Sequence, residues 1–179
     1  MDEVGRGPLA GPVVCAAVIL PLDDIIEGID DSKKLSVKKR EKLAEEISKK
    51  AIGAAICRVE PQKIDEINIL QATRLCMKNA VESLSPAADF VLTDGNMTLD
   101  IAAPQKSIVK GDAASYLIGA ASIVAKVYRD KLMDGLAVTY PEYGFDKNKG
   151  YGTAAHIEAI KAHGLTPEHR RSFVKNITG

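Results

Sequence analysis

Residues 1–20 read MDEVGRGPLAGPVVCAAVIL, and this stretch decides the fold that we predict. The segment from Gly11 to Leu20 is rich in valine, alanine and isoleucine, which is the composition of a strand buried on both faces. Asp2 and Glu3 lie in a short strand that precedes it, and the segment Gly5-Arg6-Gly7 predicts a tight turn between the two. The chain therefore opens with two carboxylates at the start of a sheet, where a scaffold can direct side chains into a cleft.

Strand and helix patterns alternate along the rest of the chain without a linker or a repeat. Helices are expected at residues 37–50, with Ser36 as the N-cap, in a short segment opened by Pro61, and at 69–84, 113–136, 153–163 and 167–175. Strands are expected at residues 52–59, 90–93 and 106–109. Mixed elements of these lengths predict one α/β layered domain over residues 1–179, with a helical C-terminal part at about 140–179.

Composition and charge exclude several classes of protein. The formal net charge is zero, so charge as a whole makes no case for nucleic-acid binding. No apolar run reaches the ~20 residues that cross a bilayer, and the first residues lack the pattern of a secretion signal. Cys15, Cys57 and Cys76 have no metal-ligand spacing, and they predict reduced, buried thiols. We therefore expect a cytoplasmic protein with no membrane partner.

Acidic residues recur at strand ends and helix starts. Asp94 directly follows the expected strand at 90–93, and Asp112 precedes the long helix. If these two side chains meet Asp2 and Glu3, the four carboxylates repel one another unless a divalent cation lies between them. A ligand set made only of oxygen favours Mg²⁺ or Mn²⁺ over zinc, and two such ions can cleave a phosphodiester. From the residues alone, ordinary structural roles are the preferred explanation: Asp112 as a helix cap, Asp94 as a turn former, and Asp2 and Glu3 as a solvated terminus.

The chain resembles the ribonuclease HII family in a series of blocks that occur in the family's order and cover nearly the whole sequence. One block alone has little weight, but the ordered set is very specific. The blocks are Asp2 to Val14, Asp31 to Leu35, Ile64 to Leu70, Asp94 to Asn96, Lys110 to Asp112, Ala120 to Val127, Lys149 to Tyr151 and His169 to Phe173.

The resemblance implies a ribonuclease H-like fold, with a five-stranded mixed sheet flanked by helices and a helical C-terminal part. It implies that Asp2, Glu3, Asp94 and Asp112 are the catalytic residues and the ligands of two Mg²⁺ or Mn²⁺ ions. The implied reaction hydrolyses the RNA strand of RNA–DNA hybrids. It also cuts on the 5′ side of single ribonucleotides in duplex DNA, leaving 5′-phosphate and 3′-hydroxyl ends, which initiates ribonucleotide removal.

The resemblance also assigns residues that bind the substrate. The main chain of Gly5-Arg6-Gly7 is implied to contact the ribose 2′-hydroxyl, the group that distinguishes RNA from DNA. Tyr151 lies in a glycine-containing loop, where a core aromatic residue would pack poorly, and is implied to stack on the sugar at the RNA–DNA junction. Phosphate contacts are implied for Ser32, Lys33 and Lys34, and further ones are expected from His169, Arg170 and Arg171.

Other features of the sequence limit or qualify this interpretation. Ser122 and Lys126 share a helix face, but they lack an oxyanion or histidine partner, so we interpret them as packing residues. No sliding-clamp peptide motif ends the chain, and we expect a monomer. Members of the family have an apolar half-strand before the first acid, whereas here only Met1 precedes it, so we expect the natural protein to begin upstream.

Two alternatives to the hybrid-cutting nuclease remain. One is another nuclease of the ribonuclease H superfamily, such as a resolvase or an integrase-like enzyme. The other is a catalytically weak nucleic-acid-binding form that results from the short start. Cleavage at a single embedded ribonucleotide separates the first alternative, and hydrolysis in Mn²⁺ separates the second.

Overall fold

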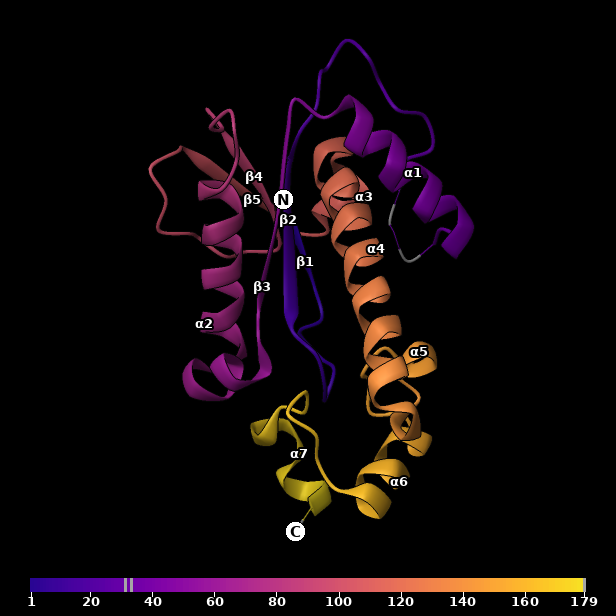
Figure 1. Ribbon diagram of the computed structural model, residues 1–179. Helices are drawn as coiled ribbons and strands as arrows, with labels where there is room; N and C mark the ends of the chain where they lie inside the picture. Colours follow the sequence, from indigo (N-terminus) through magenta and orange to yellow (C-terminus); the bar gives the residue numbers. More distant parts are fainter. Residues whose placement is uncertain (31, 33, 179) are drawn as a thin grey trace.

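The computed structural model describes residues 1–30, 32 and 34–178 (Figure 1). Within this part of the chain, three antiparallel strands form one sheet in the order β1 (Asp2–Val4), β2 (Val13–Ile19) and β3 (Gly53–Val59). A second sheet consists of two parallel strands, β4 (Val91–Asp94) and β5 (Gln105–Ile108). The α/β fold class predicted from the sequence is confirmed.

The two sheets meet at Met1. The amino group of Met1 donates a hydrogen bond to the carbonyl of Leu92 at 2.7 Å, and the N–H of Asp94 donates to the carbonyl of Met1 at 3.2 Å. The predicted single five-stranded sheet is therefore a three-stranded and a two-stranded sheet lying edge to edge. Among the described residues, only Met1 of the first strand's edge makes hydrogen bonds to β4, and one residue is too short a pairing to form a ladder.

Helices cover both faces of the three-stranded sheet. Helix α2 (Pro61–Glu82) packs on one face, and helix α4 (Tyr116–Thr139) packs on the other, with α1 (Val37–Lys50) alongside α4 (Figure 1). Alternate residues of β2 are buried in different clusters, because successive side chains of a strand point to opposite faces. Cys15 joins the cluster that includes α2, whereas Ala16 packs against Ala125 of α4. The strand is thus buried on both faces, as its composition predicts.

Side-chain caps explain where the first two helices begin and bend. The hydroxyl of Ser36 accepts a hydrogen bond from the N–H of Lys39 at 3.3 Å, which confirms the predicted start of α1. Within α2, Asn68 has a φ of 65°, and its side-chain oxygen accepts hydrogen bonds from the N–H groups of Leu70 and Gln71. The short helix and the longer helix predicted on either side of residue 68 are therefore the two parts of α2.

The long helix predicted at residues 113–136 is interrupted. A short helix α3 (Gly111–Ala114) ends at Ser115, which is extended with a φ of −129°, and α4 begins at the next residue. The break places Asp112 on a separate turn of helix beside β4 and β5.

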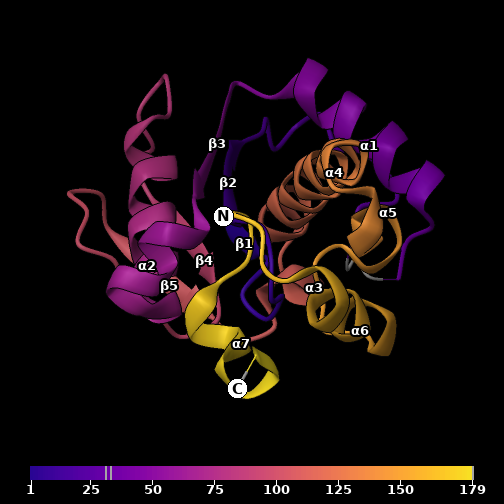
Figure 2. The ribbon, with the colours of Figure 1, turned by 60° about the horizontal axis from the view of Figure 1, so that its bottom comes forward.

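The C-terminal part gathers three short helices, α5 (Phe145–Asn148), α6 (Ala154–His163) and α7 (Arg171–Thr178), at one end of the molecule, which Figure 2 brings forward. The helix predicted at 167–175 begins only at Arg171. The preceding residues pair instead with the first loop, because the N–H of Gly11 donates to the carbonyl of Glu168 and the N–H of Arg170 donates to the carbonyl of Leu9, both at 2.8 Å.

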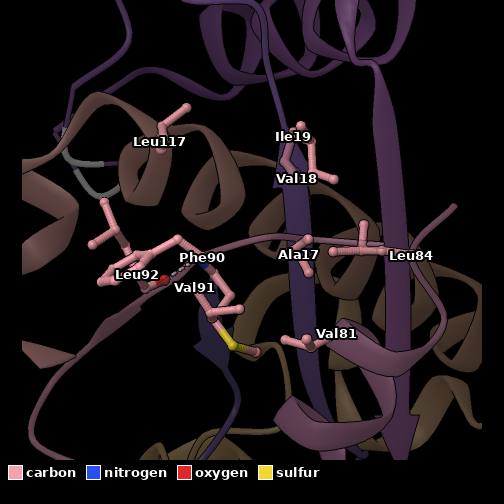
Figure 3. Close-up of a pocket in the computed structure, with 11 residues that line it drawn as sticks. Ala17, Val18, Ile19, Val81, Leu84, Phe90, Val91, Leu92 and Leu117 are labelled. Carbon is pink, nitrogen blue, oxygen red and sulfur yellow. Dashed lines mark hydrogen bonds between the residues drawn. The ribbon is translucent and has the colours of Figure 1, made fainter. Parts of the chain in front are cut away.

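A small apolar cavity of about 60 Å³ lies between β2, β4, the end of α2 and the start of α4 (Figure 3). Its lining includes Ala17, Val81, Leu92 and Leu117, and no titratable side chain is found among the described residues that line it. Its described lining therefore offers no carboxylate, imidazole or thiol that could bind a metal. Among the described residues, no helix is long and apolar enough to span a membrane.

Candidate metal centre

Three carboxylates converge where the two sheets meet. Asp2 and Glu3 belong to β1, and Asp94 ends β4. One oxygen of each side chain lies within 4.8 Å of the others. Residues that are some ninety positions apart in sequence come together because the hydrogen bonds of Met1 hold β1 against β4.

These acids line a cavity of about 230 Å³. The described residues around it are Asp2, Glu3, Val4, Ser32, Asp94, Asp112, Ser122, Lys126 and Tyr151. The fourth predicted acid therefore faces the same cavity, but it lies outside the group of three. It is next to Gly111, whose N–H donates to Oδ1 of Asp94 at 2.6 Å, so the start of α3 is held against the end of β4.

Burial and mutual repulsion disfavour ionised carboxylates in this cavity. Burial, together with the charge of Glu3, raises the pKa of Asp2 to about 7, and a hydrogen bond from Ser122 opposes the rise. Burial also raises the pKa of Glu3, whereas the nearby guanidinium of Arg6 lowers it. Without a cation the carboxyl of Asp2 is therefore only partly ionised at neutral pH, and a bound cation would favour its ionised form.

The residues present fit a divalent cation. Oε2 of Glu3 is buried and has no hydrogen-bond partner among the residues that the structure describes. Its other oxygen lies 3.5 Å from Nη1 of Arg6. A buried carboxylate oxygen without a partner is costly unless something binds it, and a donor set made only of oxygen suits Mg²⁺ or Mn²⁺.

The two motifs assigned to ribose recognition lie side by side. A Cβ on Gly7 would stand 3.7 Å from Cε1 of Tyr151. Tyr151 is 44% exposed and lines the acidic cavity, so its ring is accessible to a bound nucleotide. Arg6 and Gly7 are also exposed. The tertiary structure thus places both motifs at one edge of the carboxylate cluster, while their roles remain predictions.

Two residues that were interpreted from the sequence as packing residues belong to the cavity. Ser122 and Lys126 line it from α4, one helical turn apart. The hydroxyl of Ser122 lies 2.9 Å from the hydroxyl of Ser32, which is buried, and Nζ of Lys126 lies 2.8 Å from Oδ1 of Asp130. The sequence spacing of Ser122 and Lys126 indicates that they share a helix face. The spacing does not indicate that this face points into the cavity.

The predicted phosphate-binding loop is only partly described. Ser32 faces the cavity, whereas Lys34 is exposed and pairs with Asp30 at 4.0 Å. Lys33 lies outside the described residues.

The expectation of phosphate contacts from His169 and Arg170 is corrected by the structure. Both are buried, with exposed fractions of 2% and 0%, and both make their hydrogen bonds inside the protein. Their segment is turned inward because its backbone pairs with residues 9–11. Arg171, in contrast, is exposed at the start of α7.

The buried histidines form an ordered chain of hydrogen bonds that ends at the candidate site. The N–H of Thr166 donates to Nδ1 of His169, so the proton of that neutral ring is on Nε2. Nε2 of His169 then donates to Nε2 of His156 at 3.1 Å, and Nδ1 of His156 donates to the carbonyl of Tyr151 at 2.9 Å. Sequence spacing gave no indication of this pairing.

Comparison with solved structures places the fold. Ribonuclease H2 from Pyrococcus horikoshii OT3 matches with a TM-score of 0.83 and 28% sequence identity, over 99% of this chain and 94% of that chain. The fold and the carboxylate cavity together define a metal-dependent nuclease of the ribonuclease H class.

Sequence comparisons identify the family. The family described as Ribonuclease HII matches residues 1–176. Ribonuclease HII of Shewanella halifaxensis is 56% identical over 173 residues, which are 97% of this chain and 85% of that protein. Ribonuclease HII of Acetivibrio thermocellus is 57% identical over 176 residues, which are 98% of this chain and 69% of that protein. The chain belongs to the ribonuclease HII family and is a metal-dependent endoribonuclease, as the resemblance predicted.

Proposed function

We propose that this enzyme hydrolyses the RNA strand of RNA–DNA hybrids and also cuts on the 5′ side of single ribonucleotides embedded in duplex DNA. The products carry a 5′-phosphate and a 3′-hydroxyl. One observation carries the proposal, namely that Asp2, Glu3 and Asp94 converge within 4.8 Å in a cavity that also contains Tyr151. A metal-binding cluster next to a partly exposed aromatic ring suits a nuclease that inspects the sugar at the position it cuts.

Each acid has a place in this proposal. Asp2, Glu3, Asp94 and Asp112 would hold two Mg²⁺ or Mn²⁺ ions, the first three from the converged cluster and Asp112 from the adjoining wall. When bound, such ions supply an activated water molecule and stabilise the leaving oxygen of the phosphodiester. The hydrogen bond from Gly111 to Asp94 fixes the orientation of that carboxylate before any ligand arrives.

Substrate selection belongs to the rim of the cavity. The main chain of Gly5-Arg6-Gly7 would contact the 2′-hydroxyl, and Tyr151 would stack on the same sugar. Ser32, Lys33 and Lys34 would contact phosphates, and Arg171 at the exposed start of α7 would add another such contact. Phosphate contacts supply affinity without reading the sequence, so discrimination rests on the residues next to Tyr151.

A labelled DNA duplex with one ribonucleotide tests the proposal. Wild-type enzyme in Mg²⁺ or Mn²⁺ is expected to cut on the 5′ side of the ribonucleotide, and chelator is expected to abolish the cut. The all-DNA duplex of the same sequence is the matched substrate control, and Asp94→Asn is the enzyme control. Extension of the 3′ end by a polymerase and ligation of the 5′ end identify the termini. Cleavage of a long hybrid without cleavage at the single ribonucleotide would reject the finer proposal.

A further inference from the structure

Two arginines are fully buried beneath the loops that we assign to ribose recognition. Arg129 of α4 and Arg170 before α7 both have exposed fractions of 0%. Burial lowers the pKa of Arg129 to about 10 and that of Arg170 to about 9, so both guanidinium groups still carry their charge at neutral pH. A buried charge is unfavourable unless it is well hydrogen-bonded, and an apolar pair of similar volume is often more stable. A contribution to stability is therefore a weak explanation for the presence of two buried arginines at these positions.

The hydrogen bonds of Arg170 show what it holds. Its Nη2 donates to the carbonyl of Gly5 at 2.6 Å, and its Nη1 donates to the carbonyl of Arg6 at 2.9 Å. Its Nε and Nη2 both donate to the carbonyl of Gly11, at 2.9 and 2.8 Å. One guanidinium therefore draws together both ends of the loop that contains Gly5-Arg6-Gly7.

Arg129 connects the same loop to the second motif. Its Nε donates to the carbonyl of Pro12 at 3.0 Å, and its Nη2 donates to the carbonyl of Ala10 at 3.1 Å. Its Nη1 donates to the carbonyl of Lys149 at 2.9 Å, two residues before Tyr151. Within the part of the chain that the structure describes, the two guanidinium groups thus donate only to main-chain carbonyls of residues 5–12 and of residue 149.

Glycines in both loops leave the space that the two guanidinium groups and the neighbouring backbone occupy. Gly5, Gly11 and Gly150 have φ values of +90°, +81° and +83°, which L side chains rarely adopt. A Cβ on Gly5 would stand 2.3 Å from Nε of Arg129, and a Cβ on Gly150 would stand 2.3 Å from the carbonyl oxygen of Ala10. The loops can approach the guanidinium groups and one another only without side chains at these positions.

The direction of the carbonyls has a consequence for ligand binding. In a trans peptide the C=O of one residue and the N–H of the next point in opposite directions. Because Arg170 holds the carbonyls of Gly5 and Arg6 toward the interior, the N–H groups of Arg6 and Gly7 point away from it. These two donors therefore belong to the exposed part of the loop, where the Cβ position of Gly7 is 3.7 Å from Cε1 of Tyr151.

We propose that Arg129 and Arg170 are positioning residues, which lock the loop at residues 5–12 and the loop at residues 149–151 into one rigid unit that discriminates ribose from deoxyribose. The inference rests on the proposed function, because it assigns that discrimination to the main-chain donors of Arg6 and Gly7 and to Tyr151. Both arginines act through the backbone that they hold, and neither contacts the substrate.

Arginine-to-lysine variants test this inference. Arg129→Lys and Arg170→Lys keep the charge but lose the fork that binds several carbonyls at once. Both are made in an Asp94→Asn background, so that binding is measured without turnover. The measured quantity is the ratio of Kd for an all-DNA duplex to Kd for the same duplex with one ribonucleotide, in Mg²⁺. We expect this ratio to fall about five- to thirtyfold, the effect of losing one or two hydrogen bonds, while Kd for the all-DNA duplex stays within about threefold.

Matched controls separate positioning from loss of stability. Ile47→Ala removes buried apolar contacts between α1 and α4, away from both loops, and is expected to lower Tm without changing the ratio. If the arginine variants do not fold, Gly150→Ala displaces the same loop through the carbonyl of Ala10. Gly135→Ala, whose Cβ would meet nothing within 4 Å, is its control.

The outcomes separate the two proposals. A ratio near one in the Asp94→Asn background itself would contradict the proposed ribose recognition. The positioning role alone would be overturned if the ratio stays well above one in both arginine variants. If those variants do not fold, the same result in Gly150→Ala would overturn it. A fall in the ratio with unchanged affinity for DNA supports it, since general loosening of the fold would not act on the ribose preference selectively.

Discussion

Replacing Asp2 with asparagine should stabilise the metal-free protein while weakening its response to metal. The carboxyl of Asp2 is buried beside Glu3 and Asp94, and its pKa is raised from 3.8 to about 7. Asp2→Asn keeps the shape of the side chain and an oxygen that can accept the hydrogen bond from the N–H of Glu3, which Oδ1 of Asp2 accepts at 2.8 Å. The change therefore removes a repelled charge and little else.

The raised pKa of Asp2 determines the sign and the size of the expected change in the free energy of unfolding. A carboxyl whose folded pKa is raised binds its proton more tightly in the folded state than in the unfolded state. Its contribution to the free energy of unfolding is therefore fully present below pH 3.8, and it is lost as the pH rises from there through about 7. At about 1.4 kcal/mol per pKa unit, ionisation of Asp2 lowers the free energy of unfolding by at most about 4 kcal/mol. Asp2→Asn lacks this loss, and for a chain of this size its Tm at pH 8 should rise by up to about 8–16 °C.

Thermal unfolding in chelator, at pH values from 4 to 8, measures this effect. The difference in Tm between Asp2→Asn and wild type should be small at pH 4 and largest at pH 8. Asp89→Asn, which removes an exposed carboxylate, is the control and should change Tm little at either pH. Added Mg²⁺ should then raise the Tm of wild type more than that of Asp2→Asn, because binding to the folded state alone stabilises it. A lower Tm for Asp2→Asn at pH 8 in chelator, or an equal response to Mg²⁺, would refute the reasoning.

Three further predictions follow from the site and its surroundings. Tyr151→Ala should reduce cleavage at a single ribonucleotide by about tenfold or more and change duplex affinity much less, as stacking is worth about 1–3 kcal/mol; equal losses in kcat and in affinity would contradict this. Lys34→Ala should weaken duplex binding and reduce the slope of log Kd against log salt by about one, so an unchanged slope would remove Lys34 from the phosphate contacts. Burial beside His156 lowers the pKa of His169 from 6.5 to about 4, so wild type should lose stability as pH falls from about 6.5 toward about 4. His169→Gln lacks this titration, so its deficit in Tm relative to wild type should narrow on acidification; a constant deficit would be inconsistent with a neutral histidine pair.

The local sequence determined most of the elements and the chemical types of the site. Ser36 set the start of α1 through its hydroxyl, and the apolar residues of β2 set a strand buried on both faces, because capping and burial depend on near neighbours. The recognisable blocks around Asp2, Asp94 and Tyr151 named the family, which the comparisons confirm. An oxygen-only set of candidate ligands already favoured a hard divalent cation.

Only the tertiary structure decided which of these residues meet and which way they face. The contacts of Met1 with β4 bring Asp2 and Asp94 together, whereas Asp112 stands apart from the group of three. The sequence around Arg170 is compatible both with a surface arginine that binds phosphate and with a buried arginine that binds main-chain carbonyls. Its contacts with Gly5 and Gly11 join positions about 160 residues apart, so no local pattern encodes them. Packing settles the choice, because residues 168–170 pair with the first loop and turn this side chain inward.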